Sequence, residues 1–403
     1  MATAERKLWP WQIKRSVPLG RRIAQIIKGL IILGIAVGLP VSSIAAFPIA
    51  DSFVYSMFGE GAFQLGIATG VKGVLLLVVI FTSVAYLTLA ERRFAGLIQL
   101  RRGPNRVGWF GFLQPAADGI KFFFKEDIIP ENVHKPLYLL APIIIFTPAL
   151  TVFSVIPFGP GSVGANPYQL ASVNVGILLI FALSSLGIYG IALGGWASFS
   201  KWSLLGGLRA SAQMISYEVS LAMAAVGVLV FAGSFDLTAL ANTQAGYWLG
   251  FIPKWNMFPQ FLGFIVFVVA VFAETNRLPF DLAEAEQELV GGYHTEYSSM
   301  KFALFMLGEY ANMITGSALI TLLFLGGWHV PYLEFLALPA WIAVMVQIFG
   351  FFLKLFLLCF LFIWVRWTLP RFRYDQLMNL GWKIMLPIAL LNVILTAVVV
   401  AFV

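Results

Sequence analysis

Long runs of apolar residues, separated by shorter polar segments, divide this chain. Each run holds about 20 residues with few charges, which is the length an α-helix needs to cross the hydrocarbon core of a bilayer. Nine such runs can be read, at roughly 26–48, 65–90, 137–157, 173–194, 213–233, 258–276, 303–327, 337–364 and 384–402. The pattern predicts an all-α integral membrane protein with about nine transmembrane helices.

Composition supports this class and excludes others. With 60% hydrophobic and 11% charged residues, the chain is far from the roughly 25% charged residues of a soluble domain. The single Cys359 and the scattered His134, His294 and His329 predict neither a disulfide framework nor a metal site. The sequence contains no P-loop, no GxGxxG after a strand and no CxxC. We therefore expect no flavin, iron–sulfur cluster or metal held by this chain.

Basic residues predict the topology. They gather in the N-terminal segment and in alternate loops, whereas the intervening loops contain only Lys254. By the positive-inside rule, the N-terminus and the basic loops face the cytoplasm, and the C-terminus faces the opposite side. The net charge of +7 is thus explained by topology rather than by nucleic-acid binding.

The first apolar run has two interpretations. A basic stretch followed by apolar residues and Ala45-Ala46 is typical of a cleavable signal peptide. The run is longer than the usual signal-peptide core, which favours a retained helix. We predict that residues 1–64 form a basic interfacial segment plus one extra transmembrane helix, ahead of a membrane domain at 65–403.

The loop at 91–135 is too apolar for a solvated linker. Ile120, Phe123 and Phe124 alternate with Lys121 and Lys125 at helical spacing, which predicts an amphipathic helix. Two functions fit this helix equally well. It could lie at the bilayer surface with its lysines on lipid phosphates, or it could form a docking platform that roofs an internal cavity.

Acidic residues concentrate in one segment, Glu274–Glu309, which we call the acidic segment. It contains more than a third of the 19 acidic residues of the chain: Glu274, Asp281, Glu284, Glu286, Glu288, Glu296 and Glu309. A solvated loop is one explanation. The apolar residues among the acids argue instead for a segment with one buried face, and like charges four residues apart, such as Glu284 and Glu288, should titrate as a coupled group.

Two ionisable residues lie within apolar runs. Glu218 is flanked by apolar residues along its helix, so it is either a neutral hydrogen-bonding group between helices or part of a proton relay. Lys354, within FFLKLFLLCF, lies too deep for a helix-end anchor and could pair with a glutamate of a neighbouring helix.

Four motifs then point to one family. GPNRVG, KWSLLGGLRASAQMISYEVS, AETNRLPFDLAEAEQELVGGYHTEYSSMKFALF and LPRFRYDQLMNLGWK occur in this order along residues 65–403. Together they resemble the quinone-site membrane subunit of respiratory complex I, the NADH:quinone oxidoreductase. The first 64 residues fall outside the resemblance, and their apolar run adds a ninth helix to an eight-helix pattern.

The resemblance implies a function and a set of site residues. It implies a multi-pass subunit of the bacterial inner membrane that binds quinone. The implied partners are the peripheral-arm subunits of the quinone site and neighbouring small membrane-arm subunits. The flavin and iron–sulfur groups that supply the electrons belong to partner subunits. The implied quinone-chamber residues are Glu91, Arg92, Arg209, Glu274, Arg277 and Asp281. The implied proton path contains Glu218, Glu284, Glu286, Glu288, Glu296 and Glu309, to which we add Lys354.

Two other functions stay open. A membrane subunit of a hydrogenase-type complex would share much of this sequence pattern. A secondary transporter could use Glu218, Glu309 and Lys354 as an ion relay, but it would be expected to show internal repeats, and the sequence shows none that we can detect.

Overall fold

The structure is a computed structural model that describes residues 38–58, 62–164, 166–248, 250–283, 286–336 and 338–402. Its α-helices in the first half are α2 (Phe47–Phe58), α3 (Ala62–Ile98), α4 (Gln114–Phe124), α5 (Lys135–Thr151), α6 (Gly176–Ala197) and α7 (Lys201–Ala232). Those in the second half are α8 (Leu237–Asn242), α9 (Phe261–Glu274), α10 (Glu286–Leu289), α11 (Ser299–Phe324), α12 (Ala340–Thr368), α13 (Tyr374–Asn379) and α14 (Leu386–Phe402). Two strands, β1 (Tyr247–Trp248) and β2 (Ile252–Pro253), pair as a short antiparallel ribbon.

The all-α membrane class is confirmed. Within the described residues, seven helices are long and apolar enough to cross a membrane: α3, α5 continued to Ser154, α6, α7, α11, α12, and α13 to α14 as one helix of Tyr374–Phe402. The predicted span at 258–276 is the shorter helix α9, whose 14 residues extend only about 21 Å at 1.5 Å per residue. Most of the first predicted span lies outside the described residues.

One helix boundary differs from the prediction. The span expected at 213–233 begins at Lys201, so the motif read as a loop is the first part of a 32-residue helix and Arg209 lies within it. Its residues 201–212 carry polar groups that weaken the hydrophobic signal. Backbone hydrogen bonding nonetheless continues through them, because tertiary packing and not hydropathy decides where a helix begins.

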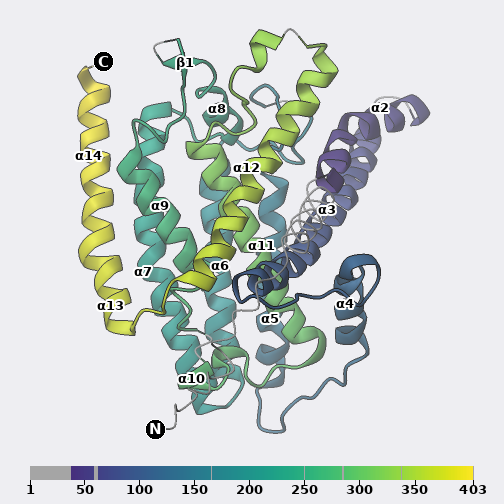
Figure 1. Cartoon of the computed structure of the whole chain (residues 1–403), viewed down its shortest axis with the longest axis vertical. Coiled ribbons are helices and arrows are strands. Elements are labelled where there is room, and N and C mark those ends of the chain that lie inside the picture. The colour runs from purple at the N-terminus through teal and green to yellow at the C-terminus, as the bar shows by residue number, and fades with distance from the viewer. Residues whose placement is uncertain are drawn as a thin grey trace, which may run out of the picture.

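The helices form a bundle around α11 (Figure 1). This helix is the most buried of the candidate spans, and it packs against α3, α5, α9 and α12. On one side, α7 packs against α6, α9 and α14, and α14 lies at the edge of the bundle (Figure 1). α10 and α13 lie at one end of the bundle, and β1 and α8 lie at the other (Figure 1).

The predicted amphipathic loop helix is confirmed as α4. It packs against α3 and α11, and its Ile120, Phe123 and Phe124 side chains are exposed. Apolar groups that face outwards on a helix beside a membrane-spanning bundle fit either a lipid surface or a partner. Both interpretations of this loop therefore remain predictions.

A close backbone approach positions the acidic segment. A Cβ atom added at Gly206 of α7 would lie 2.7 Å from both Gly292 Cα and Tyr293 N. Only glycine leaves room for this approach. The short turn at Gly292–His294 can therefore rest directly on α7, which holds the acidic segment against the bundle.

Candidate functional site

A buried arginine lies between two glutamates at the end of the bundle that carries α10. Arg277 Nε is 2.6 Å from Glu309 Oε1, and Arg277 Nη1 is 3.1 Å from Glu91 Oε2. The guanidinium stacks on the Tyr310 ring at 4.3 Å, and the Tyr310 hydroxyl donates to Glu91 Oε2 at 2.7 Å. Arg277 is 3% exposed and Glu91 is 5% exposed. Residues from α3, from the segment after α9 and from α11 thus meet away from solvent.

A second arginine completes this group. Arg366 of α12 forms an ion pair with Glu91 Oε1. We call Glu91, Arg277, Glu309, Tyr310 and Arg366 the Arg277 network. Its two arginines balance its two glutamates, which offsets the cost of placing Glu91 and Arg277 away from solvent.

The position of Arg277 depends on one glutamine of α7. The buried Gln213 Nε2 donates to the carbonyl oxygens of Ala273 at 2.9 Å and Phe280 at 2.7 Å. These two residues precede and follow Arg277 in the chain, and Asn276 between them adopts a left-handed conformation with φ of 50°. Gln213 therefore clamps the turn that ends α9 and directs Arg277 into the bundle.

The electrostatics of Arg277 follow from this placement. Burial alone lowers the pKa of an arginine, since a low-dielectric environment disfavours the charged form. The carboxylates of Glu309 and then Glu91 outweigh burial, so the pKa of Arg277 is raised well above its ordinary value. Arg277 is therefore a permanent cation, and any change of protonation in this network must occur at its other groups.

Two further ion pairs connect the acidic segment to neighbouring elements. Asp281 Oδ2 lies 2.7 Å from Arg371 Nη2, and both side chains are largely buried. Glu288 Oε2 lies 2.7 Å from Arg209 Nη1 of α7, but the Glu288 side chain is 56% exposed. The acidic segment is thus not a freely solvated loop, because described charges along it pair with cations of other elements.

A second pair of carboxylates lies on α7 and α9. The Ser185 hydroxyl donates to Glu218 Oε1 of α7. Glu274, at the end of α9, lies within electrostatic range of Glu218 and interacts with the Ser184 side chain. Glu218 and Glu274 therefore form a pair of interacting acids on adjacent helices.

The other predicted residues lie at the periphery of this site or outside the described part. Arg92 is exposed and pairs with Asp118 of α4 at 2.5 Å, so it faces the loop helix rather than Arg277. The main-chain oxygen of Glu296 accepts a hydrogen bond from the Tyr138 hydroxyl at 2.7 Å. Glu284, and the side chain of Glu286, lie outside the described residues.

Lys354 lies far from the Arg277 network. Its Nζ donates to the carbonyl oxygens of Leu325 at 2.8 Å, Gly327 at 3.0 Å and His329 at 2.7 Å. Leu325 follows Glu309 by 16 residues, or about 24 Å along a helix. Within the described residues, Lys354 forms no ion pair with a glutamate, and its partners are carbonyl groups instead.

Sequence reasoning missed several members of the site. It counted Arg366 and Arg371 only among the basic loop residues that indicate topology, whereas both pair with buried acids. Neither Tyr310 nor Gln213 was predicted as a site residue. Arg366 carried one usable signal, because it stands between apolar and aromatic residues in FIWVRW, where a charge needs a partner.

An apolar crevice adjoins the network. It has a volume of about 50 Å³ and is lined by side chains of α3, α11 and α12, among them Ala90, Ile314, Phe352 and Cys359. Ala90 directly precedes Glu91 in α3, so the crevice reaches the residue next to the buried charges. An apolar space beside convergent polar groups is a common feature of small-molecule sites, although this crevice is smaller than a typical ligand pocket.

Metal-ligating side chains are dispersed in the described part of the chain. No group there contains three or more His, Cys, Asp or Glu residues that could hold a metal ion. The chemistry that the described residues offer is therefore that of paired arginines and carboxylates.

The fold and site together define a multi-pass, all-helical membrane protein with a buried arginine–carboxylate network at one end. A family model described as NADH dehydrogenase matches residues 71–397. The chain is 50% identical to an H subunit of NADH-quinone oxidoreductase from Koribacter versatilis, in an alignment covering 82% of this chain and 96% of that protein. It is 51% identical to the H subunit of NADH-quinone oxidoreductase from Leptospira biflexa, covering 82% and 94%, and to that from Rickettsia typhi, covering 86% and 97%.

The chain therefore belongs to the NADH dehydrogenase family of membrane subunits. The resemblance to the membrane subunit of respiratory complex I is confirmed, and so is the prediction of an oxidoreductase subunit.

Proposed function

We propose that this chain forms the quinone-binding chamber of a proton-pumping NADH:quinone oxidoreductase and part of the path that couples quinone reduction to proton movement. The observation that carries the proposal is the Arg277 network, which places two cations and two carboxylates beside an apolar crevice. The names of the relatives favour this complex over a hydrogenase-type assembly.

The chemistry of quinone reduction fits such a network. A quinone takes up two electrons and two protons to become a quinol, and negative charge develops on its oxygens when electrons arrive first. Arg277 and Arg366 can stabilise that charge. In doing so they weaken their attraction for Glu91 and Glu309, and a buried carboxylate that loses its cation tends to bind a proton. Electron arrival thereby becomes proton uptake.

Glu218 and Glu274 offer a route for the proton after its uptake at the Arg277 network. Glu218 and Glu274 interact, so a proton or charge that reaches one changes the proton affinity of the other. Ser185 is within hydrogen-bonding contact of Glu218, and its hydroxyl can both donate and accept. This arrangement supports transfer from the chamber towards the middle of α7.

The basic loops support an orientation. The Arg277 network, the acidic segment and α4 lie at the end of the bundle that also carries the arginine-rich loops. By the positive-inside rule, we propose that this end faces the bacterial cytoplasm and meets the peripheral-arm subunits. The exposed Arg209–Glu288 pair is then available at that surface.

The proposal is tested by Glu218→Gln in the assembled complex. We expect NADH:quinone reductase activity and proton pumping to fall at least fivefold, while NADH–ferricyanide activity, which does not need the quinone site, is retained. Glu131→Gln is a matched control, because Glu131 is exposed, lies in the loop between α4 and α5, and belongs neither to the Arg277 network nor to the Glu218–Glu274 pair. Undiminished quinone reduction and pumping in Glu218→Gln would contradict the role in coupling.

A further inference from the structure

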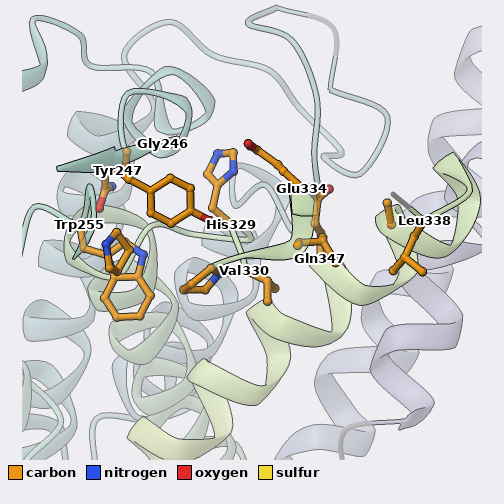
Figure 2. Close-up of a pocket in the computed structure, with 13 residues that line it drawn as sticks. Gly246, Tyr247, Trp255, His329, Val330, Glu334, Leu338 and Gln347 are labelled. Carbon is orange, nitrogen blue, oxygen red and sulfur yellow. The ribbon is translucent and has the colours of Figure 1, made fainter. Parts of the chain in front are cut away.

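A pocket lined by both polar and apolar side chains lies at the end of the bundle opposite the acidic segment. It has a volume of about 180 Å³, is partly open, and is bordered by the β1–β2 ribbon, residues 329–334, Leu338 and the start of α12. The side chains of Tyr247, Trp255, His329 and Glu334 surround it (Figure 2). One water molecule needs about 10–15 Å³ of such space and two to four polar partners. The pocket can therefore hold several waters.

The floor of this pocket covers a charged residue. Trp255 and His329 both line the pocket, and both contact Lys354. The Lys354 Nζ lies 5.0 Å from the centre of the Trp255 ring, and it donates to the His329 carbonyl oxygen at 2.7 Å. A single layer of residues thus separates the pocket from an ammonium group in the middle of α12.

The turn that holds Lys354 is rigidly built. Gly326 and Gly327 have φ of 75° and 55°, and a Cβ at Gly326 would lie 2.6 Å from Trp255 Nε1. The Gln244 Oε1 accepts a hydrogen bond from the Gly326 N–H at 2.9 Å. The hydrogen bond to Gln244 and the close approach of Trp255 therefore position the carbonyls around Lys354.

Lys354 differs from the cations of the Arg277 network. Arg277 and Arg366 are balanced by carboxylates, whereas Lys354 has only neutral carbonyls and an aromatic face as partners within the described residues. Gain or loss of one proton at Lys354 thus changes the net charge of this part of the protein.

We propose that the pocket is an aqueous vestibule through which Lys354 exchanges its proton with the solvent on the membrane face opposite the acidic segment. This inference does not depend on the quinone proposal. In the exchange, a vestibule water replaces the His329 carbonyl as acceptor, an N–H bond of Lys354 breaks and an O–H bond forms. The nitrogen keeps the electron pair, and the reverse transfer restores the ammonium.

The titratable groups around Lys354 are compatible with this role. Burial, and then the charge of Lys354, lower the pKa of His329 to about 4, so His329 is neutral at physiological pH and adds no second cation to the floor. Glu334 and Tyr247 line the wall of the vestibule, and Glu334 is exposed. On α12 itself, Cys359 contacts Ser317 of α11.

The experiment is acylation of the native complex by a membrane-impermeant sulfonated N-hydroxysuccinimide acetate, added to the face opposite the basic loops. Only an unprotonated amine that water can reach reacts. Lys254, next to Pro253 on the vestibule wall, is the internal reference for the same face. We expect acetylation of Lys354, detected by peptide mass spectrometry, with a rate that rises with pH.

Two variants test the route. Ala343→Phe places a ring in the vestibule and should slow acetylation of Lys354 at least tenfold without affecting Lys254. His329→Ala opens the floor and should accelerate it. The proposal is overturned if Lys354 stays unmodified while Lys254 reacts fully, if Ala343→Phe has no effect, or if Lys354 reacts only from the face of the basic loops.

Discussion

Arg277 and Glu91 are 186 residues apart in the chain, yet Arg277 Nη1 lies 3.1 Å from Glu91 Oε2 in a buried ion pair. The contact joins α3 to the turn after α9. Because Arg277 also pairs with Glu309, the three residues tie α3 and the turn after α9 to the central helix α11. The network is therefore both a structural connection and the centre of the proposed site.

Removing the central cation should be severe. Arg277→Ala leaves buried carboxylates without their shared arginine, and breaking a buried pair in this way destabilises by about 3–5 kcal/mol. We expect less assembled complex on native gels and loss of quinone reduction in what assembles. In the double variant Arg277→Ala/Glu309→Gln, which removes one of the stranded charges, assembly should partly recover. Equal assembly of the single and double variants would contradict the pairing.

Tyr310 should contribute in two separable ways. Tyr310→Phe removes the hydrogen bond to Glu91, worth about 1.5–3 kcal/mol for a charged acceptor, but keeps the ring beneath Arg277. Tyr310→Leu removes the ring as well, at a further cost of about 1 kcal/mol. Quinone reductase rates and thermal midpoints of the purified complex should fall in the order wild type, Phe, Leu. Identical behaviour of the two variants would show that the ring contact contributes nothing.

The two peripheral ion pairs should differ in strength. The Glu288 side chain is 56% exposed, whereas that of Asp281 is 12% exposed. Glu288→Gln should therefore change stability by less than about 1 kcal/mol, and any effect should vanish at high salt. Asp281→Asn should destabilise by about 1–3 kcal/mol at all salt concentrations. Thermal unfolding of the complex at low and high ionic strength distinguishes them.

His329 should make the loop that carries it sensitive to acid. Its pKa is about 4 in the folded protein and about 6.5 when solvated, so the open loop binds the proton more tightly. Stability present above pH 6.5 is thus lost as the pH falls towards 4, by about 2 kcal/mol at pH 5. Hydrogen exchange of amides in 326–336, corrected for intrinsic rates, should be up to about 30-fold faster at pH 5 than at pH 8. His329→Asn should abolish this dependence, and its persistence there would assign it to another group.

Much of the fold follows from local sequence. Apolar runs long enough to span a bilayer locate the membrane helices, and the spacing of Ile120, Phe123 and Phe124 locates α4. The start of α7 at Lys201 was not predictable in this way. Its first residues are too polar for a hydropathy signal, and they are helical because they pack on α6 and on the turn at Gly292–His294.

The site could be predicted as a list but not as an arrangement. The sequence by itself determined the membrane class, the family and the concentration of acids between Glu274 and Glu309, because these depend on residue type and order. Only the tertiary structure decided that Glu91 and Glu309 face Arg277 rather than solvent, and that Arg366 pairs with Glu91. It also decided that Lys354 lies near the other end of α11. Charge pairing depends on distances of about 3–4 Å between elements far apart in the chain, and no local pattern records those distances.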